Sequence, residues 1–132
     1  MSNILFSSNR TWKQRFSGAF SGLLIAIKEE ASCKVHAAVT LLVLAAALIL
    51  HINKLEFCII VLCVGCVWAA ELINSAIEWL AHAVDENVNP KIAVALDISS
   101  AAVLVMAFGS IIIGIVVFLP YLLHNFFHSF MF

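Results

Sequence analysis

An apolar stretch at residues 55–84 reads LEFCIIVLCVGCVWAAELINSAIEWLAHAV. An α-helix needs about 20 such residues to cross the hydrocarbon core of a bilayer, and this stretch is longer than that. It holds no Lys or Arg, yet the carboxylates Glu71 and Glu78 lie well inside it. The stretch therefore predicts a transmembrane helix that carries acidic side chains.

The composition of the whole chain agrees with a bilayer as its main solvent. Hydrophobic residues make up 64% of the 132 residues, and the mean hydropathy is +1.08, far above that of soluble domains. The formal net charge is only -1, which gives no attraction to nucleic acid. We expect an integral membrane protein without a nucleic-acid partner.

The remaining segments extend this expectation to an all-α membrane protein, with one domain over residues 1–132. We predict an N-terminal amphipathic surface helix at about residues 11–34 and three transmembrane helices at about residues 35–52, 55–84 and 92–123. The surface helix places its apolar side chains on one face: Trp12, Phe16, Phe20, Leu23 and Ile27.

The Lys and Arg residues predict the orientation in the membrane. Five of the seven precede the first span, and the other two are Lys54 and Lys91 in the two loops. Cytoplasmic segments carry an excess of Lys and Arg. We therefore expect the N-terminus and the second loop in the cytoplasm.

Glu71, Asn74 and Glu78 share one face of the second predicted span, and its other faces are apolar. An ionised carboxylate in the middle of a span costs roughly 2.5–3.5 kcal/mol, so this face should point into the protein. Glu30 ends the surface helix region, and Asp97 begins the third span. We expect these oxygen groups to meet in one layer on the cytoplasmic side.

Carboxylate and amide oxygens suit a hard cation, above all Mg²⁺ bound together with phosphate oxygens. The residue types alone leave three interpretations of Glu71 and Glu78 open: a catalytic metal site, an ion or proton path, and structural pairing with basic residues. The chain lacks a Gly-x-x-x-x-Gly-Lys-Ser/Thr loop, which excludes a P-loop kinase. It also lacks the Gly-x-Ser-x-Gly and His-Glu-x-x-His motifs of hydrolases and zinc proteases.

Cysteine and histidine are interpreted here as structural residues. The cysteines lack the paired spacing of a zinc site and are expected to be small buried hydrophobes: Cys33, Cys58, Cys63 and Cys66. Four histidines lie near the ends of the spans and are expected to be interfacial side chains: His36, His51, His124 and His128.

The segment Glu71-Leu-Ile-Asn-Ser-Ala-Ile-Glu78 resembles the signature of the bacterial diacylglycerol kinase/undecaprenol kinase family. The resemblance continues upstream at Gly22-Leu and Glu30-x-x-x-Lys34-x-His36. Downstream it includes Asp97-Ile-Ser-Ser-Ala-Ala-Val-Leu104 and Val117-Phe-Leu-Pro120. It covers nearly the whole chain, from about residue 10 to residue 123.

This resemblance implies an ATP- and Mg²⁺-dependent lipid kinase of the bacterial inner membrane, a homotrimer with active sites between subunits. By position, Glu71 would be the general base that takes the lipid hydroxyl proton, and Glu30 and Glu78 would hold Mg²⁺. Further nucleotide contacts would come from Asn74, Asn87, Asn89 and Asp97, and a lipid contact from Ser100.

One position departs from the family pattern. The family usually has Lys directly before the third-span Asp, whereas this chain has Leu96 before Asp97. Four other basic residues could supply a cation for the transferred phosphate: Arg10, Arg15, Lys34 and Lys91.

Two interpretations of function follow. The first is a lipid kinase, with undecaprenol favoured over diacylglycerol by His36 and by the Phe-Leu-Pro sequence at residues 118–120. The second is a non-catalytic helical oligomer of the same fold that binds nucleotides or ions, transports, or regulates, and Leu96 supports it. Retention of all the buried acids favours the kinase, because a scaffold would gain stability from apolar residues at those positions.

Overall fold

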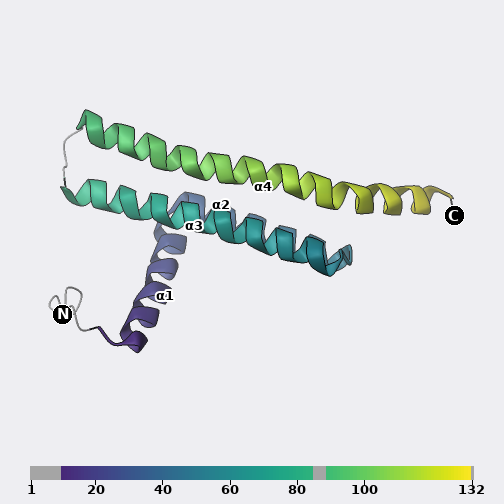
Figure 1. Cartoon of the computed structure of the whole chain (residues 1–132), viewed down its shortest axis with the longest axis horizontal. Coiled ribbons are helices and arrows are strands. Elements are labelled where there is room, and N and C mark those ends of the chain that lie inside the picture. The colour runs from purple at the N-terminus through teal and green to yellow at the C-terminus, as the bar shows by residue number, and fades with distance from the viewer. Residues whose placement is uncertain (1–9, 85–88, 132) are drawn as a thin grey trace.

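The computed structural model describes residues 10–84 and 89–131, with side chains described up to residue 126. This part of the chain is all α-helical, with no strand. Its helices are α1 (Trp12–Glu29), α2 (Ala31–Ile49), α3 (Lys54–Val84) and α4 (Pro90–Met131). Figure 1 shows α3 and α4 side by side, with α2 behind α3 and α1 leaving the other helices at a steep angle.

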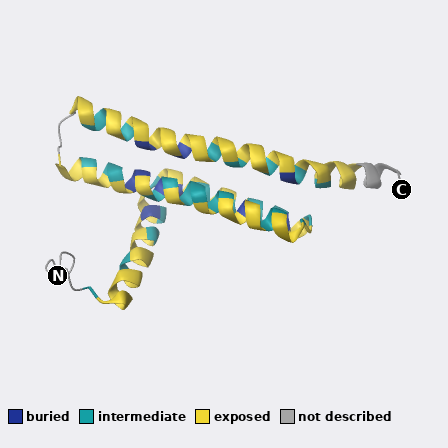
Figure 2. Ribbon diagram, in the orientation of Figure 1, coloured by how far each residue is buried: buried dark blue, intermediate teal, exposed yellow. Residues whose placement is uncertain are grey.

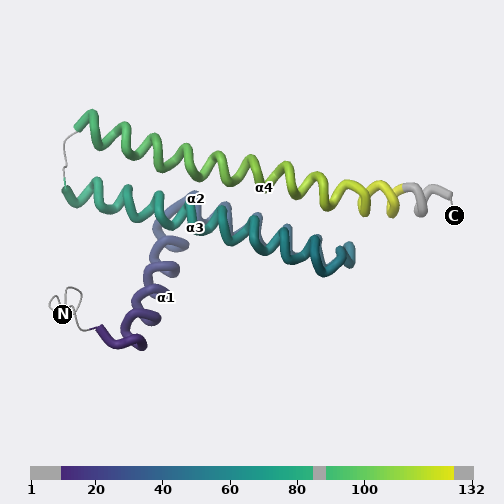
Figure 3. Tube along the Cα trace, in the orientation of Figure 1, coloured from purple at the N-terminus to yellow at the C-terminus, as the bar shows by residue number. Residues whose placement is uncertain are grey.

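Three of these helices are long and apolar enough to cross a membrane. They are Ala31–Ile49, Lys54–Val84 and the Pro90–Phe126 portion of α4. The predicted all-α fold with three candidate spans is therefore confirmed. α4 continues past Pro120, so the third helix extends beyond the predicted end at residue 123 (Figure 3).

A capping box fixes the start of α1. The Thr11 hydroxyl accepts a hydrogen bond from the Gln14 backbone N–H at 3.4 Å, and the Thr11 N–H donates to Gln14 Oε1 at 2.9 Å. These bonds satisfy backbone donors that the first helical turn leaves without partners. Trp12 and Phe16 follow, and both are exposed, as the apolar face of an interfacial helix requires.

Helix α1 ends and helix α2 begins around Glu30, earlier than the predicted end of the surface helix at residue 34. Glu30 has extended backbone angles, φ -91° and ψ 124°, and is both the C-cap of α1 and the N-cap of α2. No Gly or Pro stands at this position to mark the break in the sequence. The break turns the Glu30 side chain toward α3, where its carboxylate accepts a hydrogen bond from Trp79.

Burial in this protein is reversed relative to a soluble domain. Large apolar side chains such as Leu41, Ile73 and Val105 are exposed, and Figure 2 shows that exposed positions dominate every helix. The buried positions include four polar residues: Glu71, Asn74, Ser75 and Ser99. A bilayer or a partner subunit can cover the apolar faces, while the polar groups lie on the seam between helices.

A second polar cluster joins the helices at the other end of α3. The Asn53 N–H donates to Glu56 Oε2 at 3.1 Å, and the Glu56 N–H donates to Asn53 Oδ1 at 3.0 Å, which caps the start of α3. The Tyr121 hydroxyl of α4 donates to the same Glu56 Oε2 at 2.6 Å. This cluster fixes α4 to the loop between α2 and α3.

We expect Tyr121→Phe to lower the stability of the protein without removing its activity. A hydrogen bond to a charged group contributes about 1.5–3 kcal/mol, and the cluster lies at the opposite end of α3 from Glu71 and Glu78. Thermal unfolding in detergent measures the effect.

Glu56→Gln and the double variant complete a mutant cycle for this cluster. Tyr121→Phe removes the bond, and Glu56→Gln weakens it by removing the charge on the acceptor, so the two effects should be less than additive. Fully additive effects would contradict a direct Tyr121–Glu56 bond.

Candidate functional site

Glu71 is the centre of the candidate site. Its side chain is only 2% exposed, and α2 approaches both of its carboxylate oxygens. The Cys33 thiol donates to Glu71 Oε1 at 3.8 Å, and His36 Nε2 lies 3.6 Å from Glu71 Oε2. Cys33 also lies 3.7 Å from the Ser75 hydroxyl, one turn after Glu71. These contacts replace water around a carboxylate that the helix would otherwise place among lipid chains.

Asn74 links α3 to α4 next to this carboxylate. Its Nδ2 donates to Glu78 Oε1 at 2.6 Å on α3, and its Oδ1 accepts hydrogen bonds from two α4 hydroxyls. The donors are Ser99 at 2.7 Å and Ser100 at 3.3 Å. The Asn74 amide therefore donates through Nδ2 to α3 and accepts through Oδ1 from α4, which fixes its orientation.

Glu30 reaches the same region from the junction of α1 and α2. Its Oε1 accepts a hydrogen bond from Trp79 Nε1 at 2.7 Å, and Trp79 directly follows Glu78 on α3. Both Glu30 and Glu78 thus have one oxygen held by a donor. The structure links Asn74, Glu78 and Ser100 by hydrogen bonds, with Glu71 one turn before Asn74, and it holds Glu30 to α3 at Trp79.

Other predicted residues are less closely associated with this group. Asp97 has an exposed side chain on the second turn of α4, and Lys34 has one on the first turn of α2. Lys91 is exposed at the start of α4. Asn89 is exposed, and its Oδ1 accepts a hydrogen bond from the Lys91 N–H, which caps α4. Asn87 lies outside the described residues.

The two predicted arginines are not brought to the carboxylates within one chain. Arg15 is fifteen residues before Glu30, which corresponds to roughly 22 Å along a helix. Its guanidinium lies 5.6 Å from the ring centroid of Trp12, and its Nε donates to the Arg10 carbonyl oxygen. The Arg10 guanidinium in turn donates to the Gln14 carbonyl oxygen at 3.5 Å. Both arginines are thus engaged at the start of α1.

The donor set around Glu78 fits the requirements of Mg²⁺. Among the described residues, no group of three or more His, Cys, Asp and Glu side chains could hold a metal ion. Mg²⁺ does not need such a group, because it usually binds one or two carboxylates and takes its other ligands from phosphates and water. Two hard carboxylates, each oriented by a nitrogen donor, match this chemistry.

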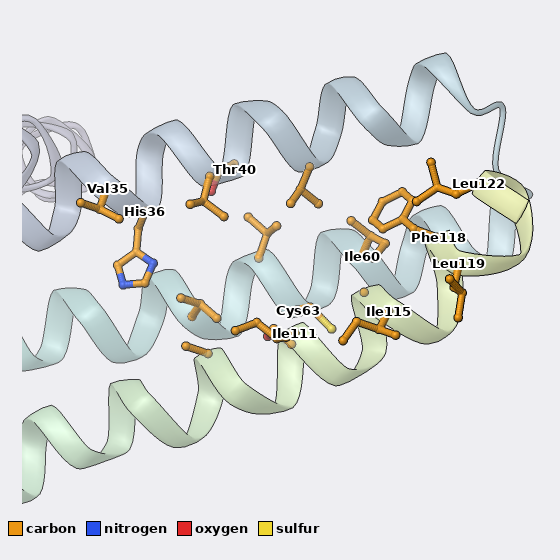
Figure 4. Close-up of a pocket in the computed structure, with 17 residues that line it drawn as sticks. Val35, His36, Thr40, Ile60, Cys63, Ile111, Ile115, Phe118, Leu119 and Leu122 are labelled. Atoms are coloured by element: carbon orange, nitrogen blue, oxygen red, sulfur yellow. The ribbon is translucent and has the colours of Figure 1, made fainter. Parts of the chain in front are cut away.

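An apolar cavity of about 520 Å³ runs between α2, α3 and α4 and begins near His36, the residue that contacts Glu71. His36 lines its end nearest to Glu71, and Phe118 and Leu122 line the far end, as Figure 4 shows. Most of the other lining side chains are aliphatic, such as Val39, Ile60 and Ile111. The carboxylate and an apolar groove are therefore adjacent.

Sequence reasoning missed several of these contacts. His36 was expected to be an interfacial side chain, and its contact with Glu71 was not predicted. Cys33 is buried as predicted, and it is also a donor to Glu71. The same prediction is wrong for Cys58, which is exposed, and Cys63 and Cys66 are only half-buried. The i, i+3 spacing of Cys33 and His36 places both on one face of α2 and was the available signal. For the Trp79–Glu30 bond the sequence gives no signal.

Together, the fold and the site define a small membrane protein with three candidate spans and a buried carboxylate–amide site beside an apolar groove. Residues 17–118 match the sequence profile of the family described as prokaryotic diacylglycerol kinase. The chain is also 33% identical to the undecaprenol kinase of Bacillus subtilis (strain 168) over 112 residues, 85% of this chain and 90% of the relative. No solved structure matches it significantly.

The chain belongs to the prokaryotic diacylglycerol kinase family. This confirms the resemblance seen in the sequence, and it identifies the class of protein as a membrane lipid kinase. The family also implies ATP as the co-substrate. Glu71 is therefore a buried carboxylate in a member of a lipid kinase family.

We expect Asn74→Asp to destabilise the protein more than Asn74→Ala. The aspartate loses the donor to Glu78 and places a second carboxylate at hydrogen-bond distance from the first, whereas alanine only removes the bonds, at about 1–3 kcal/mol. Thermal unfolding in detergent at neutral pH measures the order.

Ser100→Ala is the matched control for Asn74, because it removes only the longer of the two hydroxyl bonds to Oδ1. The midpoint of thermal unfolding should change least for Ser100→Ala among the three variants. Equal stability of the Asn74→Asp variant and the unaltered protein would show that Asn74 does not donate to Glu78.

Proposed function

We propose that the chain is an ATP- and Mg²⁺-dependent kinase that transfers the γ-phosphate to the hydroxyl of a membrane lipid, with Glu71 as the general base. The observation that carries this proposal is the position of Glu71, a buried carboxylate in contact with His36, which lines one end of an apolar groove. A hydroxyl at the end of a hydrocarbon chain in the groove would lie near this carboxylate. A general base needs such hydrogen-bond reach to the proton that it removes.

In the proposed reaction the lipid hydroxyl oxygen attacks the γ-phosphorus of ATP. An O–P bond forms to the lipid, the bond from the γ-phosphorus to the β,γ-bridging oxygen breaks, and ADP leaves. The hydroxyl proton moves to Glu71. Ser100, on the α4 face that meets Asn74, would contact the lipid head.

Glu30 and Glu78 are the residues that would hold Mg²⁺, and the bound ion would neutralise charge on the phosphates. Trp79 and Asn74 orient these carboxylates through Nε1 and Nδ2. Asn74, Asn87, Asn89 and Asp97 are the further nucleotide contacts that we propose. In-line phosphoryl transfer depends mainly on such positioning and charge balance.

The proposed assembly is a homotrimer whose active sites are completed between subunits. Asp97 supports this assembly, because its side chain is exposed on α4 rather than turned into its own chain's seam. The extensive exposed apolar surface can cover a neighbouring subunit as well as lipid. The Lys and Arg distribution supports an inner-membrane orientation with the N-terminus and the site in the cytoplasm.

Undecaprenol is the acceptor that we favour over diacylglycerol. The support is the 33% identity with the undecaprenol kinase of Bacillus subtilis along most of both chains. The groove beside Glu71 is lined almost wholly by apolar side chains, which suits a hydrocarbon tail of either lipid.

A non-catalytic role is the second candidate, and Leu96 is the observation that favours it. Leu96 stands where the resemblance implies a lysine, so the chain lacks a cation directly before Asp97. A protein that binds nucleotide without transferring phosphate would tolerate that loss. An assay of phosphate transfer to lipid, described next, distinguishes the kinase from the non-catalytic protein.

The first test measures Mg²⁺-dependent transfer of labelled γ-phosphate from ATP to undecaprenol and to diacylglycerol by the purified protein. We expect transfer to both lipids to require Mg²⁺, with the higher kcat/KM for undecaprenol. Glu71→Gln keeps the shape of the side chain and removes the base, so kcat should fall by about 10²–10⁴-fold. Nucleotide binding without transfer by the unaltered protein would favour the non-catalytic candidate.

A second test concerns the cation that replaces the missing lysine. Among the four candidates, Lys34 follows Glu30 by one helical turn and its side chain is exposed, whereas both arginines are engaged at the start of α1. We expect Lys34→Ala to raise the KM for ATP about tenfold, the effect of one lost charge-assisted contact of roughly 1.4 kcal/mol.

Lys91→Ala is the matched control for Lys34, because Lys91 is also exposed on the first turn of a candidate span. Its KM for ATP should stay close to that of the unaltered protein. A larger effect at Lys91 than at Lys34 would reverse the assignment.

A further inference from the structure

The contact between His36 and Glu71 has no role in the mechanism above. His36 Nε2 lies 3.6 Å from Glu71 Oε2, and the His36 side chain is 21% exposed, against 2% for Glu71. The ring also lines the apolar groove, at the end nearest to the carboxylate. His36 therefore lines the groove at the point where the groove approaches the carboxylate.

Both oxygens of Glu71 are approached from α2. The Cys33 thiol donates to Oε1, and His36 faces Oε2, which is consequently the oxygen on the side of the groove. A thiol is a weak donor, so Cys33 alone restrains the carboxylate only weakly. An imidazole N–H is a stronger donor and can fix the rotation of the carboxylate group.

The other polar groups of the groove are differently placed. Thr40 lies one turn beyond His36, and its Oγ1 accepts a hydrogen bond from Trp68 Nε1 at 3.0 Å. Ser110 belongs to α4, fourteen residues after Leu96. His36 is the groove residue that touches the proposed base, and it touches it from the side where the acceptor would arrive.

We propose that His36 is a positioning residue, which holds the Glu71 carboxylate with Oε2 toward the groove so that this oxygen receives the proton of the acceptor hydroxyl. This inference rests on the proposed function and adds to it a residue that acts through Glu71. Misplacing a catalytic group by about 1 Å costs roughly 100-fold in rate. The effect of losing His36 should therefore appear in kcat.

The experiment compares kcat and KM for ATP and undecaprenol in the full-length protein, unaltered and with His36→Leu, His36→Gln and His36→Asn. Leucine removes the donor, glutamine keeps an amide N–H at similar reach, and asparagine keeps the amide at a reach that is too short. We expect His36→Leu and His36→Asn to lower kcat by about 10- to 100-fold with the KM for ATP unchanged. His36→Gln should recover most of the loss.

Two controls separate positioning from a purely structural role. His51→Asn removes an exposed histidine at the opposite end of α2, where the positive φ of 50° suits asparagine, and should leave kcat unchanged. His36→Leu combined with Glu71→Gln should be no slower than Glu71→Gln alone, because His36 acts only through Glu71.

Three results would overturn the inference while leaving the proposed kinase intact. They are an unchanged kcat in His36→Leu and His36→Asn, equal losses in the glutamine and asparagine variants, and a further loss on top of Glu71→Gln. If His36→Leu does not fold, the glutamine and asparagine pair decides the question. Absence of transfer by the unaltered protein would overturn both proposals together.

Discussion

The structure depends on keeping Glu71 out of the lipid. An ionised carboxylate in the middle of a span costs roughly 2.5–3.5 kcal/mol, so α3 gains stability as a membrane helix when another element covers this residue. α2 provides that cover, with Cys33 on one oxygen and His36 on the other. The need to cover one side chain therefore fixes which face of α2 meets α3.

The same constraint explains the polar seam between α3 and α4. Asn74 cannot leave its amide unpaired at this depth, and Glu78 cannot stay without a donor. The Asn74 amide oxygen accepts hydrogen bonds from the hydroxyls of Ser99 and Ser100, and the amide nitrogen donates to Glu78. Hydrogen bonds in lipid have few competing partners, so this short chain of groups holds the register of two long helices whose outer faces are largely apolar.

Much of this arrangement could be predicted from residue spacing. The positions of Glu71, Asn74 and Glu78 on one face follow from the helical repeat, and the cost of exposing them to lipid predicts that the face turns inward. The three candidate spans follow from the lengths of the apolar runs. These features follow from the periodicity of polar residues and from the length of apolar runs, and both can be read from the sequence.

Other features depend on contacts between distant segments. The break at Glu30 has no Gly or Pro signal, and its carboxylate pairs with Trp79, 49 residues later. His36 has the position of an interfacial residue in the sequence, but α3 turns Glu71 toward it. The spacing within α2 indicates that Cys33 and His36 share a face, but it does not indicate which residue of α3 they meet. Both contacts depend on how the helices pack against one another.

The charge balance of the site shows what its ligands must bring. Glu71 and Glu78 lie on the inner face of α3, Glu30 is held to the same helix at Trp79, and Asp97 is on the second turn of α4, while Leu96 offers no positive charge. A triphosphate added to such a site would be repelled, because like charges a few ångströms apart in a medium of low polarity interact by several kcal/mol. Cations must therefore arrive with the nucleotide or from exposed lysines at the rim. In the proposed function, such an acidic site repels a free triphosphate and accepts a metal–nucleotide complex. Electrostatics alone therefore makes the site selective for that complex, before any specific contact to the base or the ribose is made.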